Sequence, residues 1–156
     1  MCRLRLQQFD HGSSPISADC TWMTSRRINL VEERLTASII GSFFDVYNYF
    51  GFGLLESVYA NALAADLRAK GHRVDREVRV PVFYKGEQIG WQRIDQLVDD
   101  KVIVETKASV KLLPTDEPQL RTYLNATKLE IGLLLHFGPT PKFYRFIVSN
   151  DMRHLR

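Results

Sequence analysis

Residues 93–108 read RIDQLVDDKVIVETKA, two apolar runs separated by an Asp-Asp pair that is typical of a turn. Because strand side chains repeat every two residues, Glu105 and Lys107 should point to the same face of the second run. Folding the runs about the Asp-Asp pair should bring Asp95 opposite Val104 or Glu105. The hairpin therefore places two carboxylates and an ammonium on an apolar sheet. This is costly unless the charges are paired or bind a metal.

The rest of the chain divides into helical and extended segments. Helical spacing of apolar residues predicts helices over residues 28–49, 54–70 and 115–127. Alternating or continuous apolar runs predict strands over residues 77–84, 88–98, 101–108, 131–137 and 143–148. The order of two helices, three strands, one helix and two strands indicates an α/β fold, with helices flanking a mixed sheet of four or five strands.

Two features predict the positions of individual strands and helix faces. Pro81 should place its strand at a sheet edge or at a bulge, whereas the strand with Glu105, apolar on both faces elsewhere, should be central. The first helix should bury Leu35, Ile39, Phe43, Val46 and Phe50. The second should bury Leu55, Val58, Tyr59, Ala62, Leu63 and Leu67.

The 156 residues are most simply one domain over residues 25–150, with a loosely ordered extension at 1–24 and a tail at 151–156. Of the formal charge of +3, residues 1–27 contribute +2, and the remaining 17 basic and 16 acidic residues leave +1. The folded part therefore lacks a polyanion-binding composition, and any contact with nucleic acid must come from a local patch.

Cysteine usage and hydropathy bear on localisation. Cys2 and Cys20 form neither a metal-binding spacing nor a disulfide framework, which favours a reducing cytoplasm. The sequence has no run of 18 apolar residues and residues 1–24 lack a signal-like apolar middle, so we expect no membrane association. Met23 is an alternative start to Met1.

The residue types of the hairpin suit metal-assisted phosphodiester hydrolysis. Asp95 and Glu105 supply the hard oxygen ligands that Mg²⁺ or Mn²⁺ prefers. Lys107 could orient the attacking water or stabilise developing charge. The backbone carbonyl of Thr106 lies between the two side chains and is a natural further ligand.

Several motifs together resemble the family named for its GxxExxY motif, a branch of the PD-(D/E)XK nuclease superfamily with a restriction-endonuclease-like core. Gly53, Glu56 and Tyr59 carry the GxxExxY pattern, and the resemblance covers roughly residues 30–147. It continues through the segments 80–86, 93–95, 104–108, 119–124 and 132–138. Phe52, Gln96, Thr106 and His136 depart from the family pattern, but none of them replaces a presumed ligand.

The resemblance implies a role for each matching residue. Asp95 and Glu105 would bind the metal with help from Glu56, and Lys107 would be the catalytic lysine. Gln119 and Tyr123, at i and i+4 on one helix face, would line the site. Tyr59 could also line it, although a core position is favoured.

Ordinary structural roles compete with these assignments. Asp95 could form a salt bridge with Arg93 or Lys107, and Glu105 and Lys107 could be a solvent-facing pair. Glu56 could simply stabilise a helix dipole, and the Gln119 pair could belong to an amphipathic face. His136 is interpreted as a hydrogen-bonded structural residue.

The favoured function is a Mg²⁺- or Mn²⁺-dependent nuclease acting on nucleic acid, with DNA as the expected substrate. The alternative is a non-catalytic nucleic-acid-binding or regulatory module that keeps the nuclease fold. A third possibility is a partner-dependent subunit that uses Phe50 and Phe52 as an interface. A homodimer would also help so small a protein to hold a duplex.

Overall fold

The structure, a computed structural model, describes residues 30–127 and 129–148. The expected extension, the tail, both cysteines and Met23 lie outside these residues. The described elements follow the expected order and form a five-stranded mixed sheet with three helices. They are α1 (Leu30–Phe50), α2 (Glu56–Ala69), β1 (Val74–Tyr84), β2 (Glu87–Val98), β3 (Val102–Lys107), α3 (Asp116–Ala126), β4 (Ile131–His136) and β5 (Lys142–Ile147).

The strands lie in the order β1-β2-β3-β4-β5, so β3 is central and β1 is at an edge. Both positions were expected, the first from the apolar character of β3 and the second from Pro81. All neighbouring pairs are antiparallel except β3 and β4, which are parallel. A parallel pair needs a crossover connection, and α3 provides it.

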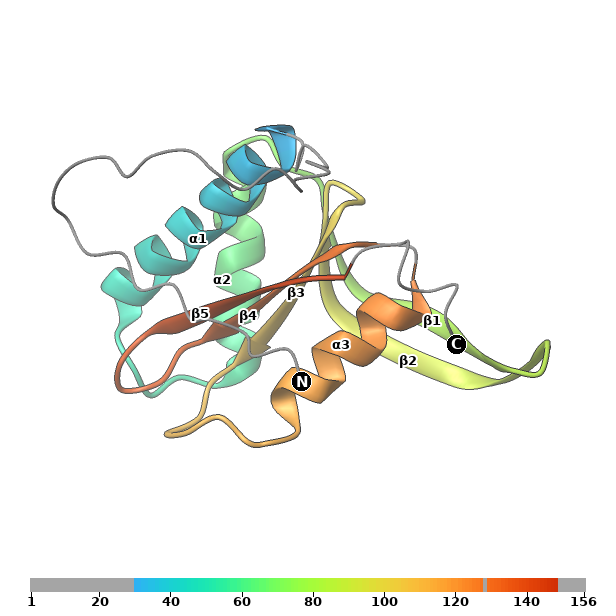
Figure 1. Cartoon of the computed structure of the whole chain (residues 1–156). Helices are drawn as coiled ribbons and strands as arrows, with labels where there is room; N and C mark the ends of the chain where they lie inside the picture. The colour runs from blue at the N-terminus through green and yellow to red at the C-terminus, as the bar shows by residue number, and fades with distance from the viewer. Residues whose placement is uncertain (1–29, 128, 149–156) are drawn as a thin grey trace, which may run out of the picture.

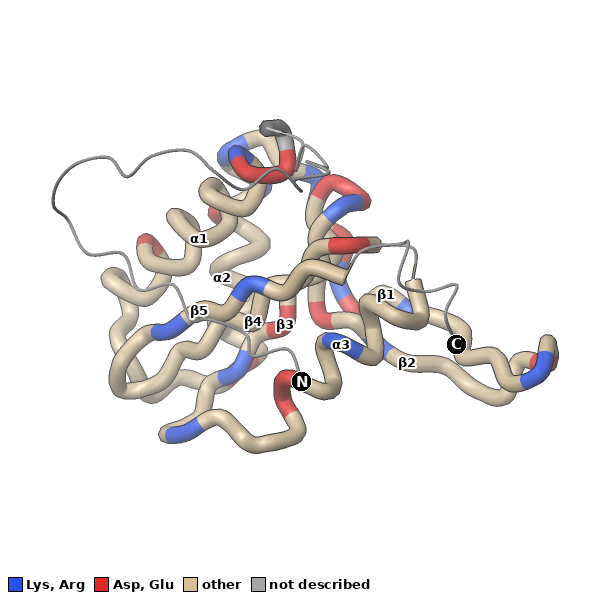
Figure 2. Tube along the Cα trace, viewed as in Figure 1, with Lys and Arg blue, Asp and Glu red and all other residues tan. Residues whose placement is uncertain are grey.

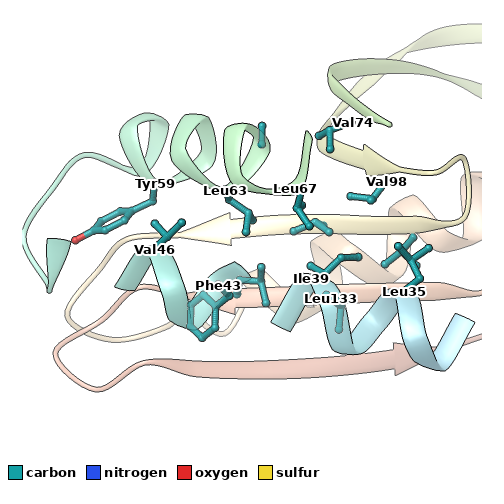
Figure 3. Close-up of a cluster of buried hydrophobic side chains, with 14 of the residues drawn as sticks. Leu35, Ile39, Phe43, Val46, Tyr59, Leu63, Leu67, Val74, Val98 and Leu133 are labelled. Carbon is teal, nitrogen blue, oxygen red and sulfur yellow. The ribbon is translucent and has the colours of Figure 1, made fainter. Parts of the chain in front are cut away.

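The helices cover both faces of the sheet (Figure 1). One core lies between α1, α2 and the sheet (Figure 3), where Val102 and Val104 of β3 meet Ile39, Phe43 and other residues of the helices. A second core lies between α3 and the sheet, where Ile103 packs with Leu120 and Leu124. β3 therefore alternates between the two cores, which places Glu105 and Lys107 on the α3 side.

Two parts of the expected helix faces are wrong. Phe50 is 43% exposed, at the last residue of α1. Leu55 precedes α2, which begins at Glu56, so Leu55 and Val58 are exposed, and Ala60 and Ala64 join Tyr59, Leu63 and Leu67 in the buried face. Among the described helices, none has the length and apolar character needed to cross a membrane.

Candidate active site

The β2–β3 hairpin has the register that its turn implied. Val98 pairs with Val102 and Gln96 with Val104, and the N–H of Lys101 donates to the carbonyl of Val98 at 3.0 Å. The turn residues Asp99 and Asp100 have φ angles of 50° and 57°, a left-handed conformation that aspartate tolerates. The expected pairing of these strands is confirmed.

Asp95 lies just beyond the last of these paired residues. Its Oδ2 accepts a hydrogen bond from the backbone N–H of Thr106 at 3.1 Å. Its negative charge is also one of the causes that raise the pKa of Glu105. The first acid therefore lies beside the second across the hairpin.

Glu105 is the most deeply buried acid of the site, with 1% of its surface exposed. Its Oε1 accepts a hydrogen bond from Nζ of Lys107 at 2.8 Å, whereas its buried Oε2 has no hydrogen-bond partner among the described residues. Burial, and then the charge of Asp95, raise the pKa of Glu105 to about 7. The carboxylate thus has one satisfied oxygen and one oxygen free to accept a ligand.

Lys107 joins β3 to α3. Besides the bond to Glu105, its Nζ donates to Oε1 of Gln119 at 3.3 Å. Burial alone would lower the pKa of Lys107, but the bond to Glu105 and the surrounding negative charges raise it above the ordinary value. The ammonium therefore stays charged beside Glu105.

Gln119 and Tyr123 come together on one face of α3, as their spacing implied. Nε2 of Gln119 donates to the hydroxyl of Tyr123 at 2.6 Å, while its Oε1 accepts from Lys107. Burial raises the pKa of the Tyr123 phenol. Gln119 can thus fix the direction in which the lysine points.

Glu56 reaches the site from the first turn of α2. Its Oε2 accepts from the N–H of Ala108, directly after β3, at 3.3 Å. Burial raises the pKa of Glu56, an effect that the charge of Lys107 and the bond from Ala108 partly offset. Glu56 is therefore close enough to the Asp95, Glu105 and Lys107 group to interact with its charges.

Tyr59 is fully buried in the core, with its ring stacked on Phe137 at 4.3 Å between ring centroids. Its hydroxyl donates to the carbonyl of Gly51 and accepts from the N–H of Leu54 at 3.2 Å. The favoured core position of Tyr59 is therefore confirmed, and its alternative assignment as a site-lining residue is not. It holds the loop that leads into Glu56, which explains why a tyrosine stands one helical turn after that acid.

The departures from the family pattern are accommodated in different ways. The amide of Gln96 donates to the carbonyl of Ala60 at 2.8 Å and ties β2 to α2. Thr106 is fully buried, and its hydroxyl has no partner among the described residues. Thr106 therefore buries an unsatisfied hydroxyl on the face of β3 opposite Glu105. Nε2 of His136 contacts the carbonyl of Ser109 at 2.7 Å, which gives this histidine the expected structural role in the loop after β3.

Asp116 is a residue that the sequence argument did not assign to the site. It is 5% exposed, and its Oδ2 accepts from the N–H of Leu113 at 2.7 Å. Its charge contributes to the raised pKa of both Glu56 and Lys107. An acid in the first turn of a helix is usually explained by its interaction with the helix dipole. Only the spacing of three residues between Asp116 and Gln119 could have indicated a place near the site.

The donor set fits a hard divalent cation. No three acidic, histidine or cysteine side chains form a ready-made cage within the described residues. However, Mg²⁺ commonly binds through one or two carboxylates and keeps several waters. Asp95 and the free Oε2 of Glu105 supply such oxygens, and the site has four carboxylates around the single ammonium of Lys107.

The fold and the Asp…Glu-x-Lys arrangement on its central hairpin define a domain of the restriction-endonuclease type. The family model described as the PD-(D/E)XK nuclease superfamily matches residues 33–146, and the chain belongs to this superfamily. Comparisons with curated proteins and with solved structures give no match to the chain.

Proposed function

We propose that this protein is a nuclease that hydrolyses phosphodiester bonds in nucleic acid with a divalent cation, Mg²⁺ or Mn²⁺, and that DNA is its substrate. One observation carries the proposal. The buried carboxylate of Glu105 has an oxygen with no partner in the part of the chain that the structure describes, within a cluster whose acids outnumber its single ammonium. Such an arrangement is costly in a metal-free core, and a bound cation offsets the cost.

Each residue would have a distinct task. Asp95 and Glu105 would hold the cation, with the backbone carbonyl of Thr106 as a further ligand and Glu56 beside it. The cation would acidify a bound water and neutralise charge on the phosphate. Lys107, directed by Glu105 and Gln119, would orient the attacking water. Tyr123 would fix the orientation of Gln119.

We further propose that the chain belongs to the GxxExxY branch of the superfamily. The positions of Glu56 and Tyr59 support this. Glu56 reaches the end of β3, and the hydroxyl of Tyr59 fixes the loop that precedes Glu56. Gly53 in that loop has a φ of 122°, which residues with a side chain rarely adopt. The cytoplasmic location expected from the cysteine usage stays a prediction.

The experiment is a cleavage assay on linear, nicked, single-stranded and RNA substrates with Mg²⁺, Mn²⁺ or EDTA. We expect the protein to cut at least one DNA substrate with a divalent cation and none in EDTA. Lys107→Ala should reduce the rate by roughly 100-fold or more. Lys111→Ala, which changes an exposed lysine shortly after the site, is the matched control and should cut normally.

Two results would contradict the proposal. Either no substrate is cut under any condition, or Lys107→Ala cuts as fast as the parent protein. Binding of nucleic acid without cleavage would instead support the non-catalytic module.

A second candidate is a nuclease subunit that depends on a protein partner. The loop between α1 and α2 and its flanks expose several large apolar side chains, Tyr49, Phe50, Phe52, Leu54 and Leu55. Single exposed apolar residues are common on protein surfaces, but a cluster of this kind next to Glu56 is typical of an interaction site. Size-exclusion chromatography with light scattering, for the parent protein and for Phe52→Ser, tests whether the protein forms a homodimer through this surface. A monomer in both cases would count against a homodimer.

A further inference from the structure

The β1–β2 hairpin extends beyond the helices (Figure 1). Near the body one face is buried, because Val78, Val80 and Ile94 pack with the core residues of α3. Alternation places the cross-strand pairs Arg79↔Arg93 and Pro81↔Trp91 on the opposite face. Arg79, Arg93 and Trp91 are exposed there. This exposed face of residues 79–93 is called the arm face below.

Two arginines lie directly opposite each other on the arm face. Like charges at such positions destabilise a strand pair. The only ion pair of either side chain among the described residues joins Arg93 to Glu77 at 3.7 Å, and both groups are more than 60% exposed. Such a pair contributes little, so the two positive charges lack a strong counter-charge within the described protein.

Large apolar side chains continue the arm face toward the tip of the hairpin. Trp91 is 60% exposed beside the arginine pair, and Phe83, on the same face of β1 as Arg79, is equally exposed. Tyr84 and Ile89 are also exposed near the tip, but alternation puts Tyr84 on the other face and Ile89 lies at a register shift. The segment from Val78 to Ile94 carries three basic residues and one acidic residue. In Figure 2 the projecting part is largely uncharged between the tip and the body. Aromatic rings beside cations that lack a strong counter-charge are the combination that binds single-stranded nucleic acid, through base stacking and phosphate contacts.

The arm face lies close to the site along β2. Arg93 precedes Asp95 by two residues on β2, roughly 7 Å along the strand, and Trp91 precedes it by four, roughly 13 Å. Arg93 and Trp91 lie on the face of β2 opposite α3, whereas Glu105 and Lys107 lie on the α3 side, so a strand bound to the arm face would reach the site by passing around the sheet.

We propose that the arm face binds a single-stranded segment of the nucleic-acid substrate, with Arg79 and Arg93 on phosphates and Trp91 stacked on a base. This inference rests on the proposed nuclease function, because the bound strand is the one that is cut. It specifies a substrate with a single-stranded part, such as a tail or a gap, in preference to an uninterrupted duplex.

The test measures binding separately from cleavage. Fluorescence anisotropy in EDTA follows labelled oligo-dT, oligo-U and a blunt duplex on full-length protein that carries Lys107→Ala. Adding Trp91→Ala should weaken oligo-dT binding by roughly 5- to 100-fold and duplex binding by much less. Trp91→Phe, which keeps a stacking ring, should restore most of the affinity. Tighter binding of oligo-U than of oligo-dT would assign the arm face to RNA and still support it.

Arg79→Ala and Arg93→Ala should each lower the salt dependence of oligo-dT binding by about 0.7 in the logarithmic slope. Arg145→Ala, an exposed strand arginine on the opposite edge of the sheet, is the matched control and should leave the slope unchanged.

Unchanged oligo-dT binding in the Trp91 and arginine variants would overturn the arm proposal even if the parent protein cuts DNA. Dissociation of a dimer by Trp91→Ala, with no change in oligonucleotide binding, would overturn it in favour of a contact between two copies. Conversely, loss of binding in these variants together with no cleavage by the parent protein would leave the arm as a binding surface and remove the nuclease proposal.

Discussion

Nζ of Lys107 lies 2.8 Å from Oε1 of Glu105, two residues earlier on the same face of β3, and it leaves the second oxygen of that carboxylate without a partner in the described structure. One ion pair therefore compensates only part of the cost of burying Glu105. This explains why its pKa rises to about 7 although an ammonium is in direct contact. The site is strained electrostatically in the way that a bound cation would relieve.

The raised pKa of Glu105 predicts how the metal-free protein responds to pH. With an ordinary value of 4.5 and a folded value of about 7, the folded state holds this proton more tightly than the unfolded state. The stabilisation is complete below pH 4.5 and is lost as the pH rises through 7. Relative to Glu105→Gln, which cannot ionise, the parent protein should lose on the order of 3 kcal/mol as the pH rises from 4.5 through 7. Thermal melts of both proteins in EDTA at a series of pH values check this. If the melting temperatures of the two proteins changed in parallel with pH, the prediction would be contradicted.

Tyr59→Phe tests whether the hydroxyl positions Glu56. The variant keeps the ring stack on Phe137 but leaves the carbonyl of Gly51 and the N–H of Leu54 without their bonds. We expect a loss of about 1–3 kcal/mol in the free energy of unfolding, together with a lower cleavage rate because the loop before Glu56 loosens.

Tyr47→Phe is the matched control for this variant. The hydroxyl of Tyr47 also donates to backbone carbonyls, those of Gly138 and Pro139 at 3.0 and 3.1 Å, but among the described residues it makes no hydrogen bond to the loop before Glu56. It should lose stability without a comparable loss of cleavage. Equal losses of rate in both variants would mean that Tyr59 has only a general structural role.

Asp116→Asn tests the acid that the sequence argument missed. Asparagine can still accept the bond from Leu113, so the start of α3 should persist, but one negative charge leaves the site. The pKa values of Glu56 and Lys107 should both fall, because Asp116 raises each of them. The Mg²⁺ concentration for half-maximal cleavage should rise by roughly 10-fold. Glu117→Gln is the control, since this exposed neighbour pairs with Arg121 at 2.8 Å, and an equal effect there would refute a specific role for Asp116.

The hairpin, the positions of β1 and β3 in the sheet and the Asp95, Glu105 and Lys107 group could be predicted because they depend on local patterns. A two-residue period and an Asp-Asp turn fix the register, and Pro81 restricts its strand to an edge. The role of Tyr59 could not be predicted in this way. It depends on a loop conformation that brings the carbonyl of Gly51 to a ring eight residues later.

The errors in the helix faces have a similar cause. The exposure of Leu55 and Val58 follows from where α2 begins, and helix boundaries are the least certain part of a sequence pattern. The electrostatic contribution of Asp116 depends on how α3 is placed against β3, which no local pattern specifies.

Gly138→Ala should create a steric conflict with the ring of His136, and a second substitution at His136 should relieve it. A Cβ at Gly138 would lie 2.4 Å from Cε1 and 2.7 Å from Nε2 of His136, and the imidazole is itself held by the carbonyl of Ser109. The single variant should therefore lose roughly 1–3 kcal/mol of stability.

His136→Ala alone should also be costly, because it leaves the carbonyl of Ser109 without its contact. In the double variant, however, the added methyl group would occupy space that the ring has left. The two costs should therefore sum to more than the measured cost of the double variant, by about 1 kcal/mol or more. Denaturant unfolding of the four proteins measures this coupling. Gly41→Ala, where a Cβ would meet no atom within 4 Å, should instead stabilise α1. Strict additivity in the cycle would show that Gly138 is required for some reason other than the histidine ring.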